Sequence, residues 1–143
     1  MVCFSALYSK GSLKMKEIIN SIKAPGAVGP YSQAVCFNLS KTNELIYTSG
    51  QLPIDKETGK MPDTIESQTR QSLQNVVYIL EEKGMSLDHV IKTTVYLSDI
   101  KNFTKMNGIY SEFFKNPYPS RSAFEVAELP LGALVEIEVV AAK

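Results

Sequence analysis

Two amphipathic helical patterns, separated by a stretch of β-branched residues, limit the fold of this 143-residue chain more than any other feature of its sequence. The first pattern predicts a helix over residues 64–83. Asp63 with Glu66 fits an N-terminal capping pair, and Gly84 fits the position after the last turn. The residues that recur at helical spacing are Thr69, Leu73, Val76, Val77 and Leu80. We therefore expect this helix to bury one face.

The second helical pattern covers residues 100–114, with Asp99 as its candidate cap. Its apolar face consists of Phe103, Met106, Tyr110 and Phe113. Strand patterns lie at residues 34–38, 44–49, 90–97, 122–126 and 133–141. This order of elements predicts an α+β fold, a mixed β-sheet with two helices packed on one face. Because two helices cover only one face, the other face must contact water or another subunit.

The start of the chain differs from the rest. Residues 1–14 carry Lys10, Lys14 and no acid, which fits an N-terminal extension that is either disordered or a targeting peptide. No repeat or linker divides residues 15–143, so we expect a single domain there. The predicted compartment is the cytoplasm, or the mitochondrion or another organelle if residues 1–14 are a transit peptide.

Composition excludes several classes of function. The 15 basic and 15 acidic residues balance, so a broad electrostatic attraction to nucleic acid is not expected. No apolar run approaches the roughly 18 residues of a membrane-spanning helix, so no membrane association is expected. Cys3, Cys36 and His89 are too few for a disulfide framework or a Cys/His metal site. We therefore expect no metal site.

Arginine is scarce, with only Arg70 and Arg121 in the chain. Arg70 lies four residues after Glu66 on the first predicted helix, where an ion pair along the helix is expected. Arg121 follows a proline-rich stretch and opens a short strand, which would fix its backbone. Its guanidinium would then bind a carboxylate through two parallel hydrogen bonds, or pair with an acid of its own fold. Both interpretations stay open on spacing alone.

The last predicted strand contains two acids, Glu136 and Glu138. A period of two places both on one face, with Val135, Ile137 and Val139 on the other. Burying unpaired acids costs free energy. That face is therefore either solvated or lines a cleft in which a carboxylate holds water or moves a proton.

Four further residues are candidates for a ligand site. Gly50, beside Ser49 at the end of a strand, permits a close backbone approach to a ligand or simply ends the strand. Tyr31 ends a turn-rich segment, where its phenol would pack or point into a pocket. Asn107 lies in the middle of the second helix, where a polar residue beside an apolar stripe usually bridges something.

Six separated segments, in this order, carry a resemblance to a known family. They are residues 29–35 (GPYSQAV), 48–53 (TSGQLP), 70–76 (RQSLQNV), 90–97 (VIKTTVYL), 119–130 (PSRSAFEVAELP) and 135–138 (VEIE). In these segments the chain resembles the RidA (YjgF) family of reactive intermediate imine deaminases, whose members are also named endoribonuclease L-PSP. The resemblance covers about residues 16–142.

The resemblance implies a chorismate-mutase-like fold that assembles as a homotrimer with clefts between subunits. It also implies hydrolysis of 2-iminobutanoate and 2-iminopropanoate, reactive enamine and imine intermediates, to 2-oxo acids and ammonia, without a cofactor. Two alternatives remain open: an RNA-cleaving translation inhibitor, which the neutral charge disfavours, and a non-catalytic trimer that binds a small 2-imino or 2-oxo acid.

By position, the family's catalytic and binding roles fall on residues of this chain. Arg121 would bind the substrate carboxylate, Glu136 would position the water, and Tyr31 would add a hydroxyl. The further substrate-binding positions are Ser49, Gly50, Asn107 and Ala123. Some relatives carry a cysteine where this chain has Ala123, so the resemblance implies no thiol-dependent step here.

Overall fold

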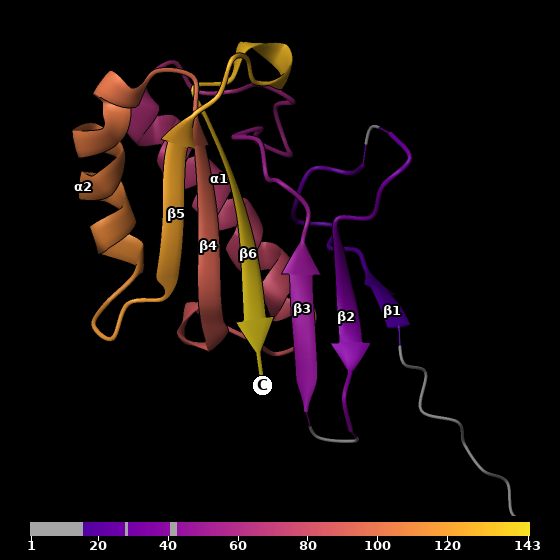
Figure 1. Cartoon of the computed structure of the whole chain (residues 1–143). Coiled ribbons are helices and arrows are strands. Elements are labelled where there is room, and N and C mark those ends of the chain that lie inside the picture. Colours follow the sequence, from indigo (N-terminus) through magenta and orange to yellow (C-terminus); the bar gives the residue numbers. More distant parts are fainter. Residues whose placement is uncertain (1–15, 28, 41–42) are drawn as a thin grey trace, which may run out of the picture.

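The computed structural model describes residues 16–27, 29–40 and 43–143 (Figure 1). The N-terminal extension predicted for residues 1–14 lies outside these ranges. The strands are β1 (Lys16–Ile19), β2 (Ala34–Asn38), β3 (Glu44–Thr48), β4 (Val90–Leu97), β5 (Ser120–Glu125) and β6 (Val135–Ala142). The α-helices are α1 (Ile65–Glu81) and α2 (Phe103–Phe113), and three short 3-10 helices are η1 (Leu87–His89), η2 (Ile100–Asn102) and η3 (Pro130–Gly132).

The strands form one mixed sheet in the order β1-β2-β3-β6-β4-β5, and both α-helices lie against the same face of it (Figure 1). Among the strand pairs of the described residues, β4 and β5 alone are parallel, because α2 connects them as a crossover. The predicted α+β fold is confirmed. The sequence analysis missed β1, which pairs at the sheet edge with β2, because four residues are too few to establish a period.

The predicted first helix is confirmed as α1, but its predicted N-cap is wrong. Thr64, not Asp63, is the N-cap, and its hydroxyl accepts a hydrogen bond from the amide of Ser67 at 3.2 Å. Ser67 in turn accepts from the amide of Thr64 at 3.2 Å, which completes a capping box. Because Thr64 is the residue with extended backbone, the third helical position is Ser67 rather than Glu66. Gly84 has φ +61°, as expected after a helix C-terminus.

The buried stripe of α1 follows the prediction with one difference. Thr69, Leu73, Val76 and Leu80 are all fully buried. Val77 is only partly buried, whereas Ile79 is completely buried. The stripe is therefore rotated slightly around the helix axis from the predicted one.

The second helix begins with η2, whose first turn Asp99 caps by accepting from the amide of Lys101 at 2.9 Å. The α-helix α2 itself starts at Phe103. Met106 and Tyr110 are buried, and the other two residues of the predicted apolar face, Phe103 and Phe113, are partly buried against the core.

The ion pair predicted between Arg70 and Glu66 is wrong. Arg70 instead pairs with Glu112 of α2 at 2.5 Å, and Glu66 lies 3.9 Å from Lys105 of the same helix. Because α1 and α2 pack side by side, these side chains meet partners on the neighbouring helix rather than along their own.

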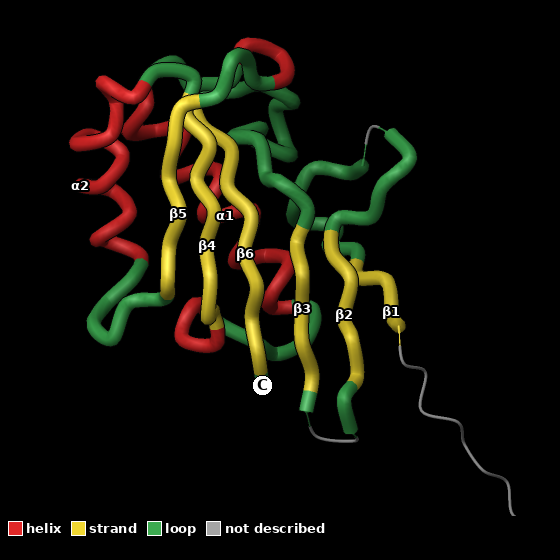
Figure 2. The backbone as a smooth tube through the Cα atoms, in the orientation of Figure 1, coloured by secondary structure: helices red, strands yellow, loops and turns green. Residues whose placement is uncertain are grey.

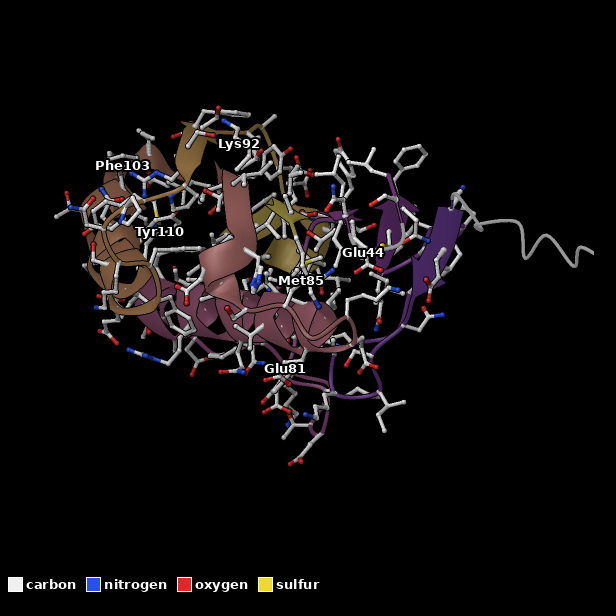
Figure 3. The ribbon with its side chains drawn as sticks, turned by 90° about the horizontal axis from the view of Figure 1, so that it is seen from below. Glu44, Glu81, Met85, Lys92, Phe103 and Tyr110 are labelled. Carbon is white, nitrogen blue, oxygen red and sulfur yellow. The ribbon has the colours of Figure 1, made fainter. Side chains whose placement is uncertain are left out.

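The core lies between the helices and the inner face of the sheet. Along β6, Val135, Ile137 and Val139 are buried while Glu136 and Glu138 are half-buried on the opposite face, which confirms the predicted alternation. This opposite face, which we call the open face, carries partly exposed apolar rings such as those of Tyr47 (52% exposed) and Phe124 (45% exposed). Lys92 points from the sheet on the side away from α1 (Figure 3).

The described part of the chain has no helix with the length and apolar character needed to cross a membrane. Over the same residues, no group of three or more His, Cys, Asp or Glu side chains is placed to bind a metal ion.

Candidate active site

A cleft of about 670 Å³ opens where β3 ends and β6 begins. Figure 2 shows that the loop leaving β3 and the loop entering β6 lie at the same end of the sheet. Four predicted site residues line this cleft: Tyr31, Ser49, Gly50 and Glu136. The structure therefore brings together residues from three separate segments of the chain.

Gly50 allows the Glu136 side chain to lie directly against the backbone. A Cβ at position 50 would lie 2.7 Å from Cδ and 3.0 Å from Cγ of Glu136, and it would overlap Oε1. The two segments are held together by Gln51, whose amide donates to the carbonyl of Ile137 at 2.8 Å and whose carbonyl accepts from the amide of Ile137 at 3.3 Å. Any side chain at position 50 would therefore displace the carboxylate.

Glu136 and Asp55 are the two acids that line the cleft. Burial raises the pKa of Glu136 above the usual value for a glutamate. The negative charge of Glu138, two residues along the same face, raises the pKa of Glu136 further. Glu138 itself accepts a hydrogen bond from the hydroxyl of Tyr96 at 3.1 Å. A carboxylate whose pKa is raised is a stronger proton acceptor once ionised, which suits a general base.

Ser49, directly after β3, is hydrogen-bonded to the segment that precedes β2. Its hydroxyl donates to the carbonyl of Ser32 at 2.6 Å, and its amide donates to the carbonyl of Gln33 at 2.8 Å. Tyr31, one residue before Ser32, is 48% exposed and lines the same cleft. The position of Tyr31 thus depends on the contact between this segment and the end of β3.

Gln33 is a structural residue of the site that the sequence analysis did not identify. Its buried amide oxygen accepts from the amide of Ser21 at 2.5 Å. Its amide nitrogen donates to the carbonyls of Ser21 (3.1 Å), Ala24 (3.4 Å) and Pro25 (2.7 Å). One side chain therefore holds the irregular segment that forms a wall of the cleft. The only signal in the sequence was its place between Tyr31 and a strand.

Asn75 of α1 holds another wall of the cleft through hydrogen bonds to the backbone, as Gln33 does. It is fully buried, and its amide nitrogen donates to the carbonyls of Leu52 and Ile54 at 3.0 Å each. Gln71 donates to its amide oxygen at 3.0 Å. Because Leu52 and Ile54 line the cleft, a polar residue on the buried side of α1 fixes the shape of the site.

Arg121 and Asn107 do not line this cleft. A nitrogen of the Arg121 guanidinium, Nη1, donates to Oδ1 of Asn107 at 2.7 Å, and the guanidinium carbon lies 4.6 Å from the ring centroid of Tyr110. Arg121 is opposite Thr93 in the β4–β5 register, and Thr93 is completely buried on the helix side. Figure 3 shows Tyr110 on the same side, in α2.

Glu136 is opposite Tyr96 on the open face, so the two charged candidates lie on opposite faces of the sheet. Ala123 is opposite the buried Val95 and shares the helix side with Arg121. Within the described residues no acid forms an ion pair with Arg121. The described residues therefore do not show the ion pair between Arg121 and an acid of its own fold, which was one of the two interpretations of Arg121.

The comparison with known families agrees with this architecture. The sequence model of the endoribonuclease L-PSP family matches residues 21–143. The chain belongs to this family, the RidA (YjgF) family. The resemblance deduced from the six sequence segments is confirmed.

Three relatives of this RidA family member illustrate the similarity. It is 42% identical to Reactive Intermediate Deaminase A, chloroplastic, of Arabidopsis thaliana, covering 96% of this chain and 72% of that protein. It is 41% identical to the human 2-iminobutanoate/2-iminopropanoate deaminase, covering 89% of this chain and 90% of the human protein. The crystal structure of E. coli TdcF with bound serine has a TM-score of 0.80 at 38% identity, covering 89% of this chain and 98% of that one.

Proposed function

We propose that the protein is an imine deaminase, a hydrolase that converts 2-imino acids such as 2-iminobutanoate and 2-iminopropanoate to 2-oxo acids and ammonia. The observation that carries this proposal is the half-buried Glu136, placed at a glycine-lined point of the cleft with a raised pKa. The names of the human and Arabidopsis relatives support the same activity.

The reaction needs little more than a positioned water and a base. An imine carbon is already electrophilic. As the water oxygen bonds to it, the C=N π bond breaks, and Glu136 takes one proton from the water and passes it to the nitrogen, which gives the carbinolamine. The hydroxyl proton of the carbinolamine then moves to the nitrogen through Glu136, the C–N bond breaks, ammonia leaves and the C=O bond of the 2-oxo acid forms. Proton transfer of this kind contributes about 10²–10⁴-fold to a rate.

The substrate carboxylate requires a cation, and we propose that Arg121 supplies it in a homotrimer. Among the described residues Asn107 accepts a hydrogen bond from one Arg121 nitrogen, and the remaining guanidinium nitrogens would form two parallel hydrogen bonds to a carboxylate. Because Arg121 and Glu136 lie on opposite faces of one sheet, the site would combine Arg121 and Asn107 of one subunit with the Glu136 cleft of the next. The partly exposed apolar rings of the open face support an assembly that covers them.

Tyr31 and the backbone at Ser49 and Gly50 would contribute hydrogen-bond donors on the Glu136 side of this shared site. The serine bound to E. coli TdcF is a small molecule with a carboxylate and an amine on one carbon. A 2-imino acid has the same arrangement of groups, which supports a ligand of this size and charge.

The test is a coupled assay in which a dehydratase generates 2-iminobutanoate and semicarbazide traps what is not hydrolysed. We expect the protein to suppress semicarbazone formation. Glu136→Gln should lower this turnover by about 10²–10⁴-fold while calorimetry still detects binding of 2-oxobutanoate. Glu138→Gln is the matched control when turnover is measured at a pH above the acidic limb of the pH–rate profile, since it removes the same charge from the same strand face outside the cleft. Unchanged turnover in Glu136→Gln would remove Glu136 from the mechanism.

A further inference from the structure

Apolar side chains form a large part of the cleft lining. Leu52, Ile54, Pro130 and Leu131 line it together with Glu136, and we call these four residues the apolar wall. The volume of the cleft, about 670 Å³, lies within the range typical of pockets that hold ligands much larger than 2-iminopropanoate. An apolar wall offers nothing to the carboxylate or the imine nitrogen, so it has a use only for the remaining part of a substrate.

Leu131 is the unusual member of this wall. It is 73% exposed, and its backbone has φ +58° and ψ +18°, the left-handed region that leucine rarely adopts. The turn is maintained by its neighbours, with the amide of Gly132 donating to the carbonyl of Leu129 at 3.3 Å and the amide of Ala133 to that of Pro130 at 3.2 Å. Strained backbone of this kind concentrates at ligand sites. The strain here presents a large apolar side chain to the cleft that Glu136 also lines.

Leu52 and Ile54, in contrast, belong to the rigid part of the wall. Their carbonyls are both bound by the buried Asn75 side chain, at 3.0 Å each. The cleft therefore combines a fixed apolar surface from the loop after β3 with an exposed leucine from η3. An aliphatic group in contact with both surfaces would be removed from water by each of them.

We propose that Leu131 is a specificity-determining residue that, with Leu52 and Ile54, binds the side chain of the substrate and makes the protein selective for imino acids with long apolar side chains. This inference rests on the proposed deaminase function. Each methylene of the substrate buried against the wall is expected to raise kcat/KM by about fourfold. The leucine-derived imino acid should accordingly be hydrolysed more efficiently than the alanine-derived 2-iminopropanoate.

The experiment compares two imines, generated from leucine and from alanine by an amino acid oxidase and trapped with semicarbazide. Leu131→Ala should lower kcat/KM for the leucine-derived imine by about tenfold and change that for 2-iminopropanoate by less than about twofold. Leu131→Gly should lose the same selectivity while keeping the fold, because glycine adopts the left-handed region freely. Leu39→Ala is the matched control, because Leu39 is 57% exposed and directly follows β2. The C-terminal end of β2 lies at the opposite end of the sheet from η3 (Figure 1).

Three results would overturn the inference. The first is a wild-type protein that prefers 2-iminopropanoate, and the second is a selectivity that survives both Leu131 substitutions. The third is loss of selectivity only together with a changed oligomeric state in size-exclusion chromatography, which would make Leu131 a subunit contact. The first two leave the proposed deaminase function intact.

A protein that accelerates no imine hydrolysis would overturn the proposed function instead. Calorimetry then still decides whether Leu131 selects among ligands, with 4-methyl-2-oxopentanoate and pyruvate as the long and short probes. A preference for the longer oxo acid that disappears in Leu131→Gly supports the role of Leu131, and equal binding by both proteins contradicts it.

Discussion

Replacing Gly50 by alanine should change the position of the Glu136 carboxylate in the cleft while having little effect on the stability of the fold. The new Cβ would lie 2.7 Å from Cδ of Glu136, so the carboxylate must move. The atoms in conflict belong to the end of a flexible side chain, so the cost of overpacking should be at the low end, about 1 kcal/mol. For a domain of this size that corresponds to a loss of roughly 3 °C in Tm. Displacing a reacting group by about 1 Å, however, can reduce a rate on the order of 10²-fold.

We therefore expect Gly50→Ala to melt within a few degrees of the wild type but to hydrolyse 2-iminobutanoate about 100-fold more slowly. Differential scanning fluorimetry and the semicarbazide assay measure the two effects. Gly26→Ala is the matched control, because Gly26 also lines the cleft but a Cβ there meets nothing within 4 Å. Wild-type turnover in Gly50→Ala would show that catalysis does not require the close approach of Glu136 to position 50. An unfolded variant would show that the Glu136 side chain cannot move away from the new Cβ.

Three further perturbations test the site. Arg121→Lys keeps the charge but loses the two parallel hydrogen bonds, so KM for 2-iminobutanoate should rise by about 10–100-fold at unchanged Tm; an unchanged KM in initial-rate measurements would contradict the carboxylate-binding role. Glu138→Gln removes a negative charge that raises the pKa of Glu136. Since the ionised form of Glu136 is the active base, the acidic limb of the pH–rate profile should move to lower pH, and a shift to higher pH would reverse the argument. Gln33→Ala leaves buried backbone groups around Ser21 without partners, and urea unfolding should report a loss of about 2–4 kcal/mol; a loss below about 1 kcal/mol would mean that water replaces the side chain.

Most elements of the fold could be predicted from the sequence because each has a strong local period. The helix over α1, the strand β4 and the alternation along β6 were confirmed for that reason. Where local patterns competed, the prediction failed. Both Asp63 and Thr64 are suitable N-caps by residue type, and only the backbone conformation of Thr64 selects between them.

Contacts between elements could not be predicted in this way. Arg70 has an acid four residues before it on the same helix, yet it pairs with Glu112 of α2, because the two helices lie side by side. The side chains of Gln33 and Asn75 satisfy backbone carbonyls of irregular loops. Such loops have no period, so nothing in the local sequence indicates which buried amide will hold them.

The sequence by itself determined the family, the order of strands and helices from β2 onward, and the face of β6 on which Glu136 lies, since a period of two is visible within one strand. Only the tertiary structure decided that Arg121 lies on the other face, because the face of a residue on β5 depends on its parallel register with β4. Register is the pairing of residues between two neighbouring strands, and here those strands are joined through α2. It cannot be deduced from the sequence of either strand alone. For the same reason, the meeting of Gly50 with Glu136 could be known only once β3 and β6 were placed side by side.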